Sequence, residues 1–280
     1  MGAYEDGLAA LQRQDYATAL SLLRMSAERG NAEAQLGLGA MYCLGAGVAI
    51  DYVEALKWYR LAAEQQNARA QNILGTMYSR GDGVAQDYAE AAKWYRLAAD
   101  QGNPSALHNL GTMYYLGAGV AQDYAEAFNF FRRAADLGNA DAAEALGTMH
   151  GNGQGVAADW AEALKWYRVA ADQGHADAQW NLGAVYRIGR GVERDYAAAV
   201  QWYRLAANHG HAKAQDDLGG MYFNGLGVAQ DHVEAHMWVS LADAGGNRDA
   251  GQNRSILESA MTSEQIDEAK RRAAEWVPAR

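Results

Sequence analysis

Three side chains near the C-terminal end of the sequence have the spacing of a metal site. His232 and His236 stand four residues apart with Glu234 between them, so a helix could present both imidazoles to one metal ion. The H-E-x-x-H order of a zinc protease is absent, and the equivalent positions of other repeats hold tyrosine at the first histidine and leucine, phenylalanine or valine at the second. We therefore expect packing residues and no metal site, with a metal-dependent enzyme as the weaker alternative.

Two other features could carry chemistry. Cys43 is the only cysteine, so the chain has no internal disulfide framework and no cysteine-cluster metal site, and we expect an incidental thiol. A G-x-G-V segment occurs six times, from Gly45 to Val228, and such loops can hold phosphate at the start of a helix. No strand precedes them and no P-loop lysine follows, so we expect turns between helices and no cofactor.

Charge and composition exclude several partners. The 280 residues include 24 basic and 34 acidic side chains, a net charge of -10, which argues against nucleic acid and anionic membranes. No apolar stretch approaches the roughly 20 residues of a membrane-spanning helix, so no membrane insertion is expected. The sequence as written predicts a cytoplasmic protein, or a periplasmic or secreted one if an N-terminal signal peptide was trimmed.

The elements that must position any site come from an internal repeat. An aspartate recurs every 36 residues from Asp15 to Asp231, a Leu-Gly pair recurs from Leu38 to Gly219, and a glycine ends most units. Within one unit, residues 32–43 and 51–65 each place apolar side chains at helical spacing. Such pairs cannot bury their apolar faces alone and must stack. The predicted fold is an all-α solenoid of 36-residue helix-turn-helix repeats, with a capping helix pair in residues 1–31, six repeats in 32–247 and a capping pair in 248–280.

Local signals predict how the helices begin, end and pair charges. Asp51 with Glu54 resembles a capping box, and the same pattern recurs in most units. Gln66 replaces the glycine that ends the second helix elsewhere, so we expect a looser turn there. Arginines such as Arg60, Arg96, Arg132 and Arg168 precede an acid by four residues, which predicts ion pairs along the helix surface.

The repeat resembles the Sel-one-like repeat (SLR) family, a relative of the tetratricopeptide repeats. Residues 70–102 match A-x-x-x-L-G-x-x-Y-x-x-G-x-G-V-x-x-D-Y-x-x-A-x-x-W-Y-x-x-A-A-x-x-G at every specified position. The resemblance implies a right-handed α/α superhelix, a bacterial origin and a concave groove, lined by the first helix of each repeat, that holds a peptide. Disulfide-bridged relatives differ from this chain, which has only Cys43.

Candidate binding residues lie where the repeat varies. With Leu38 at zero and 100° per residue, positions 33, 36, 40 and 43 fall at about 140° to 220°, opposite the packed stripe. Large or polar side chains occupy the equivalent positions and have no core role in the pattern. The predicted concave-face residues are Asn72, His108, Tyr115, Trp180, Arg187, Asp216 and Phe223. The alternative is that these positions face water and vary freely.

The hypothesis that follows is a non-enzymatic scaffold that binds a protein or peptide partner along this face. A self-associating structural adaptor that joins copies through its end units is the second alternative, besides the metal-dependent enzyme. The sequence leaves the partner and the oligomeric state open.

Overall fold

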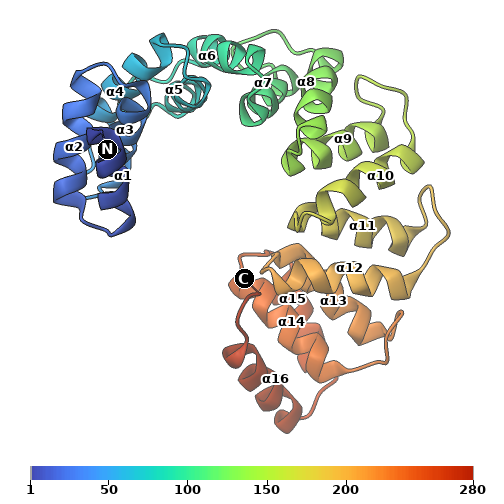
Figure 1. The fold of residues 1–280 in the computed structure, drawn as a ribbon. Helices are drawn as coiled ribbons and strands as arrows, with labels where there is room; N and C mark the ends of the chain where they lie inside the picture. Colours follow the sequence, from blue (N-terminus) through green and yellow to red (C-terminus); the bar gives the residue numbers. More distant parts are fainter. Residues whose placement is uncertain (1, 280) are drawn as a thin grey trace. The chain divides into compact units, whose positions relative to one another are not determined.

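The computed structural model describes residues 2–279, and all the regular structure in this range is helical (Figure 1). Helices alternate along the chain as the first and second members of pairs. The first helices are α1 (Ala3–Gln12), α3 (Ala32–Leu44), α5 (Ala68–Arg80), α7 (Pro104–Leu116), α9 (Ala140–Asn152), α11 (Ala176–Ile188), α13 (Ala212–Asn224) and α15 (Ala250–Glu258). The second helices are α2 (Tyr16–Glu28), α4 (Tyr52–Glu64), α6 (Tyr88–Asp100), α8 (Tyr124–Asp136), α10 (Trp160–Ala171), α12 (Tyr196–Asn208), α14 (His232–Ala244) and α16 (Ser263–Glu275).

The helices form two compact units, one ending at Asn139 and the other beginning at Ala140. Within each unit, a first helix packs on its own second helix, and that second helix packs on the next first helix, except that α16 packs on α14. Each pair thus covers the apolar face of its neighbour, as the 36-residue period requires. The predicted all-α solenoid is confirmed.

Aspartate fixes the start of most second helices. One carboxylate oxygen of Asp51 accepts from the backbone N–H groups of Val53 and Glu54, each at 3.0 Å, which satisfies two donors that the helix itself leaves unpaired. The expected capping box is incomplete, because the Glu54 side chain instead pairs with Lys57 at 2.5 Å. The cap therefore consists of the aspartate side chain alone, without a return hydrogen bond from the Glu54 side chain.

Glycine in the Leu-Gly pair lets the two helices of a repeat touch. A Cβ added at Gly75 would lie 2.6 Å from the Tyr95 ring, and one at Gly183 would lie 2.5 Å from the Tyr203 ring. Any side chain at these positions would separate the helices, because a real Cβ cannot approach so closely. The glycine that follows each repeated leucine is thus a packing residue.

Buried glutamines, which the sequence analysis missed, tie one pair to the next. Gln71 is 4% exposed, and its Nε2 donates to the Ala63 carbonyl at 3.1 Å while its Oε1 accepts from Gln101 at 2.7 Å. The signal was available, because glutamine recurs at 36-residue intervals at Gln35 and Gln71 and again at Gln179 and Gln215. Burial of an amide is tolerated here because it is hydrogen-bonded.

The expected arginine ion pairs are largely wrong. Arg132 does pair with Asp136, at 3.2 Å. By contrast Arg60, Arg96 and Arg168 donate to the hydroxyls of tyrosines 18 residues later in the sequence, on the first helix of the following pair. These arginines thus bind a tyrosine hydroxyl of the next pair and not the exposed carboxylate four residues later on their own helix.

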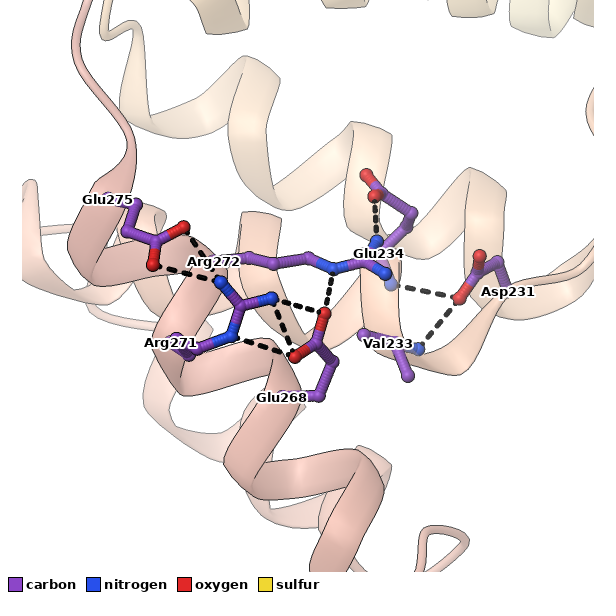
Figure 2. A network of polar contacts seen from close by, with 7 residues as sticks. All are labelled: Asp231, Val233, Glu234, Glu268, Arg271, Arg272 and Glu275. Carbon is purple, nitrogen blue, oxygen red and sulfur yellow. Dashed lines mark hydrogen bonds and ion pairs between the residues drawn. The ribbon is translucent and has the colours of Figure 1, made fainter.

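The last helix leaves the pattern and packs on α14. In three earlier repeats the glutamate of the second helix pairs with a lysine three residues later, but Met237 occupies that lysine position and is buried. Glu234 pairs instead with Arg272 of α16 at 2.7 Å, and Arg272 also pairs with Glu268 at 2.7 Å (Figure 2). Arg271 completes this network by pairing with Glu268 and Glu275.

Apolar contacts reinforce the docking of α16. The Trp238 and Trp276 rings meet edge to face at 6.2 Å between centroids, and Ala273 packs on the same buried cluster. Thr262 and Gln265 form a complete capping box at the start of the helix.

Candidate functional site

The candidate residues lie on one face of the first helices. This face, here called the first-helix face, comprises the positions equivalent to 36, 37, 40, 43 and 44 of α3. All seven predicted residues are half-buried. Leu36, in the same position as Asn72, is only 6% exposed and belongs to the core, so the face is not a uniformly solvated surface.

Asn72 and Asp216 each accept hydrogen bonds from the next first helix. Asn109 Nδ2 lies 3.1 Å from Asn72 Oδ1, and Asn253 Nδ2 lies 2.9 and 3.0 Å from the two oxygens of Asp216. Both contacts join positions 37 residues apart. These side chains therefore link adjacent repeats. Neither the hypothesis of partner binding nor the alternative that these positions only face water predicts this role.

Trp180 and Arg187 of α11 belong to one polar network. The Trp180 indole donates from Nε1 to Asp217 Oδ2 at 2.7 Å, and Arg187 Nε donates to the Tyr203 hydroxyl at 3.0 Å. Lys213 Nζ lies over the Trp180 ring, 5.2 Å from its centroid. The indole is thus held on both its edge and its face, in a fixed orientation.

The remaining predicted residues contact rings of the second helices. Tyr115 meets Tyr124 edge to face, with ring centroids 5.2 Å apart, and Phe223 tilts against His232 at 5.2 Å. His108 lies 5.6 Å from the Phe131 ring. These aromatic contacts orient the side chains along the face, and each repeat presents a different ring or polar group there.

The most exposed apolar side chains of this face were missed. Leu44 is 77% exposed, Leu116 64% and Ile188 51%, and each is the last residue of its helix before a left-handed glycine cap. The sequence signal was a large aliphatic residue next to the cap glycine. Exposed aliphatic groups at one repeated position are what a partner could cover with gain in free energy.

Three hollows recur at the same register of the repeat. The α5–α7 hollow, about 400 Å³, is lined by Ser79, Tyr95 and Leu116 among others. The α10–α11 hollow, about 130 Å³, lies beside Tyr167 and Ile188. The third, the α13–α15 hollow, is about 220 Å³ and its lining includes Asp216, Phe223 and Ile256. The α5–α7 and α13–α15 hollows lie between two successive first helices and a second helix, whereas the α10–α11 hollow is lined by one helix of each kind and the loop after α11.

Two carboxyl groups on this face are strongly desolvated. Burial raises the pKa of Glu144, although Thr148 and Asn181 both donate to its Oε1 at 2.9 Å. Burial likewise raises the pKa of Asp217, against the stabilising hydrogen bond from Trp180. Neutral donors hydrogen-bond to both acids and hold them in place, so each carboxyl group serves as a fixed hydrogen-bond acceptor.

The residues of the alternative metal cluster take separate partners. His236 is fully buried and contacts Glu258 at 3.1 Å and Ser240 at 3.2 Å. Glu234 pairs with Arg272, and His232 packs on Phe223. Within residues 2–279 no group of three or more histidine, cysteine or acidic side chains is placed to hold a metal ion. Burial raises the pKa of the Cys43 thiol, which disfavours the reactive thiolate.

The glycine loops are filled by the preceding repeat. A Cβ at Gly83 would lie 2.4 Å from the Tyr52 carbonyl oxygen, and one at Gly119 would lie 2.3 Å from the Tyr88 carbonyl carbon. The loops therefore lie backbone to backbone against the previous second helix, where a phosphate would have no room. In the part of the chain that the structure describes, no helix is both long and apolar enough to span a bilayer.

The family model of the Sel1 repeat matches seven consecutive segments, residues 1–31, 32–67, 68–103, 104–139, 140–175, 176–211 and 212–246. The chain belongs to the Sel1 repeat family. The first Sel1 repeat match includes the N-terminal helix pair, and the last ends before α15 and α16. Sel1 repeat proteins generally act as scaffolds for protein interactions. A comparison with curated proteins finds no match.

Solved Sel1 repeat structures resemble this one. A Sel1 repeat protein from Oxalobacter formigenes is 37% identical, with a TM-score of 0.81, and the match covers 86% of this chain and 99% of that one. The protein c5321 of uropathogenic Escherichia coli, described as a protective antigen with an SLR fold, is 28% identical over 98% of this chain and 83% of its own, with a TM-score of 0.56. The immunity protein PA5088 from Pseudomonas aeruginosa, at 22% identity, 78% and 82% coverage and a TM-score of 0.54, shares the fold.

Proposed function

We propose that this Sel1 repeat protein is a non-enzymatic scaffold that binds a peptide segment or a protein partner along its first-helix face, the expected concave face of the solenoid. The observation that carries the proposal is the coincidence of exposed aliphatic residues with the hollows. Leu116 and Ile188 stand at equivalent positions, and each lines a hollow. Within the C-terminal unit, an extended partner can place one side chain in the α10–α11 hollow and another in the α13–α15 hollow, and can cover Ile188.

The polar groups around the hollows support recognition more than catalysis. The Tyr95 and Tyr167 hydroxyls each lie 3.1 Å from the hydroxyl of a threonine, and burial raises the pKa of Tyr167 to about 12. A phenol with so high a pKa is a poor general base or nucleophile at neutral pH. Fixed donors and acceptors of this kind set the orientation of a bound chain.

Affinity capture from a lysate of the source organism tests the proposal. Leu116→Glu and Ile188→Glu place a charge on the rim of two hollows without entering the core, because both side chains are more than half exposed. Leu97→Glu is the matched control, since Leu97 is 47% exposed on a second helix. We expect the rim variants to lose the partner that wild type and Leu97→Glu retain. Retention by all four proteins, with equal circular dichroism, contradicts binding at this face.

Light scattering at two protein concentrations separates the scaffold from the self-associating adaptor. A partner-binding scaffold keeps the mass of one chain, 30.3 kDa, at both concentrations. A mass that rises with concentration and falls in the rim variants would assign the first-helix face to contacts between copies.

A further inference from the structure

The α13–α15 hollow differs from the other two because two side chains are smaller. Val239 stands where the second helices of earlier repeats carry the tyrosine or phenylalanine that fills this space, and Gly220 stands where first helices carry alanine or threonine. A Cβ added at Gly220 would meet no atom within 4 Å. The space beside Gly220 is therefore open, whereas an alanine or threonine side chain stands at this position in the other repeats.

The lining of this hollow combines apolar side chains with one carboxylate and two asparagines, Asn224 and Asn253. Phe223, Val239 and Ile256 line it together with Asp216, and Ile256 is 52% exposed. The only hydrogen-bond donor to the Asp216 oxygens within residues 2–279 is the neutral amide of Asn253. Among the described residues Asp216 forms no ion pair, so a cationic group of a ligand would meet no competing cation at this carboxylate.

The charges around Asp216 are mixed, but the nearby cations have other partners. Asp217 follows directly on α13, and burial, with a smaller contribution from repulsion by Asp216, raises its pKa. Arg187 acts on Asp217 and is bonded to Tyr203, while Lys213 lies over Trp180; neither forms an ion pair with Asp216. An anionic ligand group would be repelled here, whereas a cation is attracted.

A long basic side chain satisfies both features at once. The methylene stem of arginine or lysine gains free energy against apolar walls, while its charged head stays at the edge of the pocket. A guanidinium or ammonium there forms a charge-assisted hydrogen bond with the carboxylate, which is stronger than a neutral one.

We propose that the α13–α15 hollow binds an arginine or lysine side chain of the partner, so that the partner presents a basic residue at the C-terminal end of the first-helix face. This inference rests on the proposed scaffold function and deepens it, because it assigns the chemistry of one contact. Asp216 is the specificity-determining residue, and Gly220 keeps the hollow open.

Titration with blocked tripeptides, followed by NMR, tests the assignment. The probes are acetyl-Ala-X-Ala-amide with arginine, lysine, norleucine or glutamate at X, so that norleucine supplies the apolar stem without the charge. Asp216→Asn introduces the residue found at the equivalent Asn72, and Gly220→Thr introduces the residue of Thr76 and Thr112. Both variants therefore use side chains that this repeat already accommodates.

We expect the arginine and lysine probes to bind wild type about tenfold more tightly than norleucine, with the glutamate probe weakest. Asp216→Asn should bring arginine and norleucine to equal affinity, and Gly220→Thr should weaken both by at least about tenfold. Equal binding of arginine and norleucine to wild type overturns the proposal, and so does an arginine preference that survives Asp216→Asn. The two proposals fail separately: if the tripeptides do not discriminate but Leu116→Glu still loses its partner, only the basic-residue contact is wrong.

Discussion

At the scale of single residues, each position of the 36-residue template has a physical requirement, and departures from it can be measured. Gln66 is the clearest departure in the described part of the chain. It adopts φ 62°, the left-handed conformation that Gly30 and Gly102 adopt at equivalent positions. The turn is therefore as tight as in the other repeats, contrary to the expected loosening, and the strain lies in the glutamine backbone.

Gln66→Gly is predicted to raise the free energy of unfolding by about 0.5 to 1 kcal/mol. Relief of the left-handed strain exceeds the entropy that glycine adds to the unfolded chain. Gly102→Gln is the reciprocal control and should lose about 1 kcal/mol, since a Cβ added there meets no atom within 4 Å and the cost comes from the backbone conformation. Urea unfolding measures both. A stability loss in Gln66→Gly would contradict this account.

Two adjacent glycines of α13 should respond in opposite ways to alanine. A Cβ at Gly219 would lie 2.5 Å from Val239 Cγ2 and 3.0 Å from the Ala235 carbonyl oxygen, so Gly219→Ala should cost about 2 kcal/mol through overpacking. Gly220→Ala meets open space and should gain about 0.5 to 1 kcal/mol from helix propensity. Thermal unfolding of the two variants distinguishes them, and equal shifts would mean that α13 and α14 are not in close contact.

Glu144→Gln is predicted to stabilise the protein at neutral pH. Burial raises the pKa of Glu144 in the folded state above its unfolded value, so the folded form binds the extra proton and loses stability as pH rises through that window. Glutamine keeps the acceptor for Thr148 and Asn181 without the charge. The gain should be largest near about pH 7.5 and smaller near about pH 4.5.

Urea unfolding at both pH values measures the effect, with Glu64→Gln as control because Glu64 is exposed and forms no ion pair in the described residues. A gain that did not depend on pH, or an equal gain in the control, would show that the charge of Glu144 is not the cause.

At the scale of helices, most boundaries were predictable because they depend on local chemistry. Aspartate caps, glycine stops and the 36-residue spacing define the pairs from sequence alone. The docking of α16 on α14 could not be predicted from local chemistry, because it depends on a contact between Glu234 and Arg272, which are 38 residues apart. Only the loss of the lysine at Met237 hinted that this surface of α14 is covered.

Removal of Arg272 should loosen α16 selectively. Arg272→Gln breaks its pairs with Glu234 and Glu268, and half-exposed ion pairs of this kind are worth about 0.5 to 1 kcal/mol. Trp276→Ala should cost more, about 2 kcal/mol, because it removes buried apolar area. Amide hydrogen exchange should accelerate in residues 263–275 and remain unchanged in α9 to α12. Uniform acceleration throughout the C-terminal unit would show that α16 is part of one cooperative unit.

At the scale of the whole molecule, the stacking of helix pairs could be predicted from the sequence, whereas the proposed binding face could be predicted only in part. The repeat placed Trp180, Phe223 and the other candidates on one face of the first helices. It did not reveal that Asn72 and Asp216 bind the following repeat, since a hydrogen bond across 37 residues leaves no mark in a single helix pattern. Leu116 and Ile188 lie outside the stripe of positions 33, 36, 40 and 43, so that stripe alone does not predict the exposed rim.

The most direct test of the central claim is a hydrogen-exchange footprint of the protein with its captured partner bound. We predict protection along the first helices, in residues 108–118 of α7 and its loop and 180–190 of α11 and its loop, with the exposed faces of α6 and α10 unchanged. Protection confined to the second helices, with none at Leu116 or Ile188, would contradict a scaffold that binds through its first-helix face.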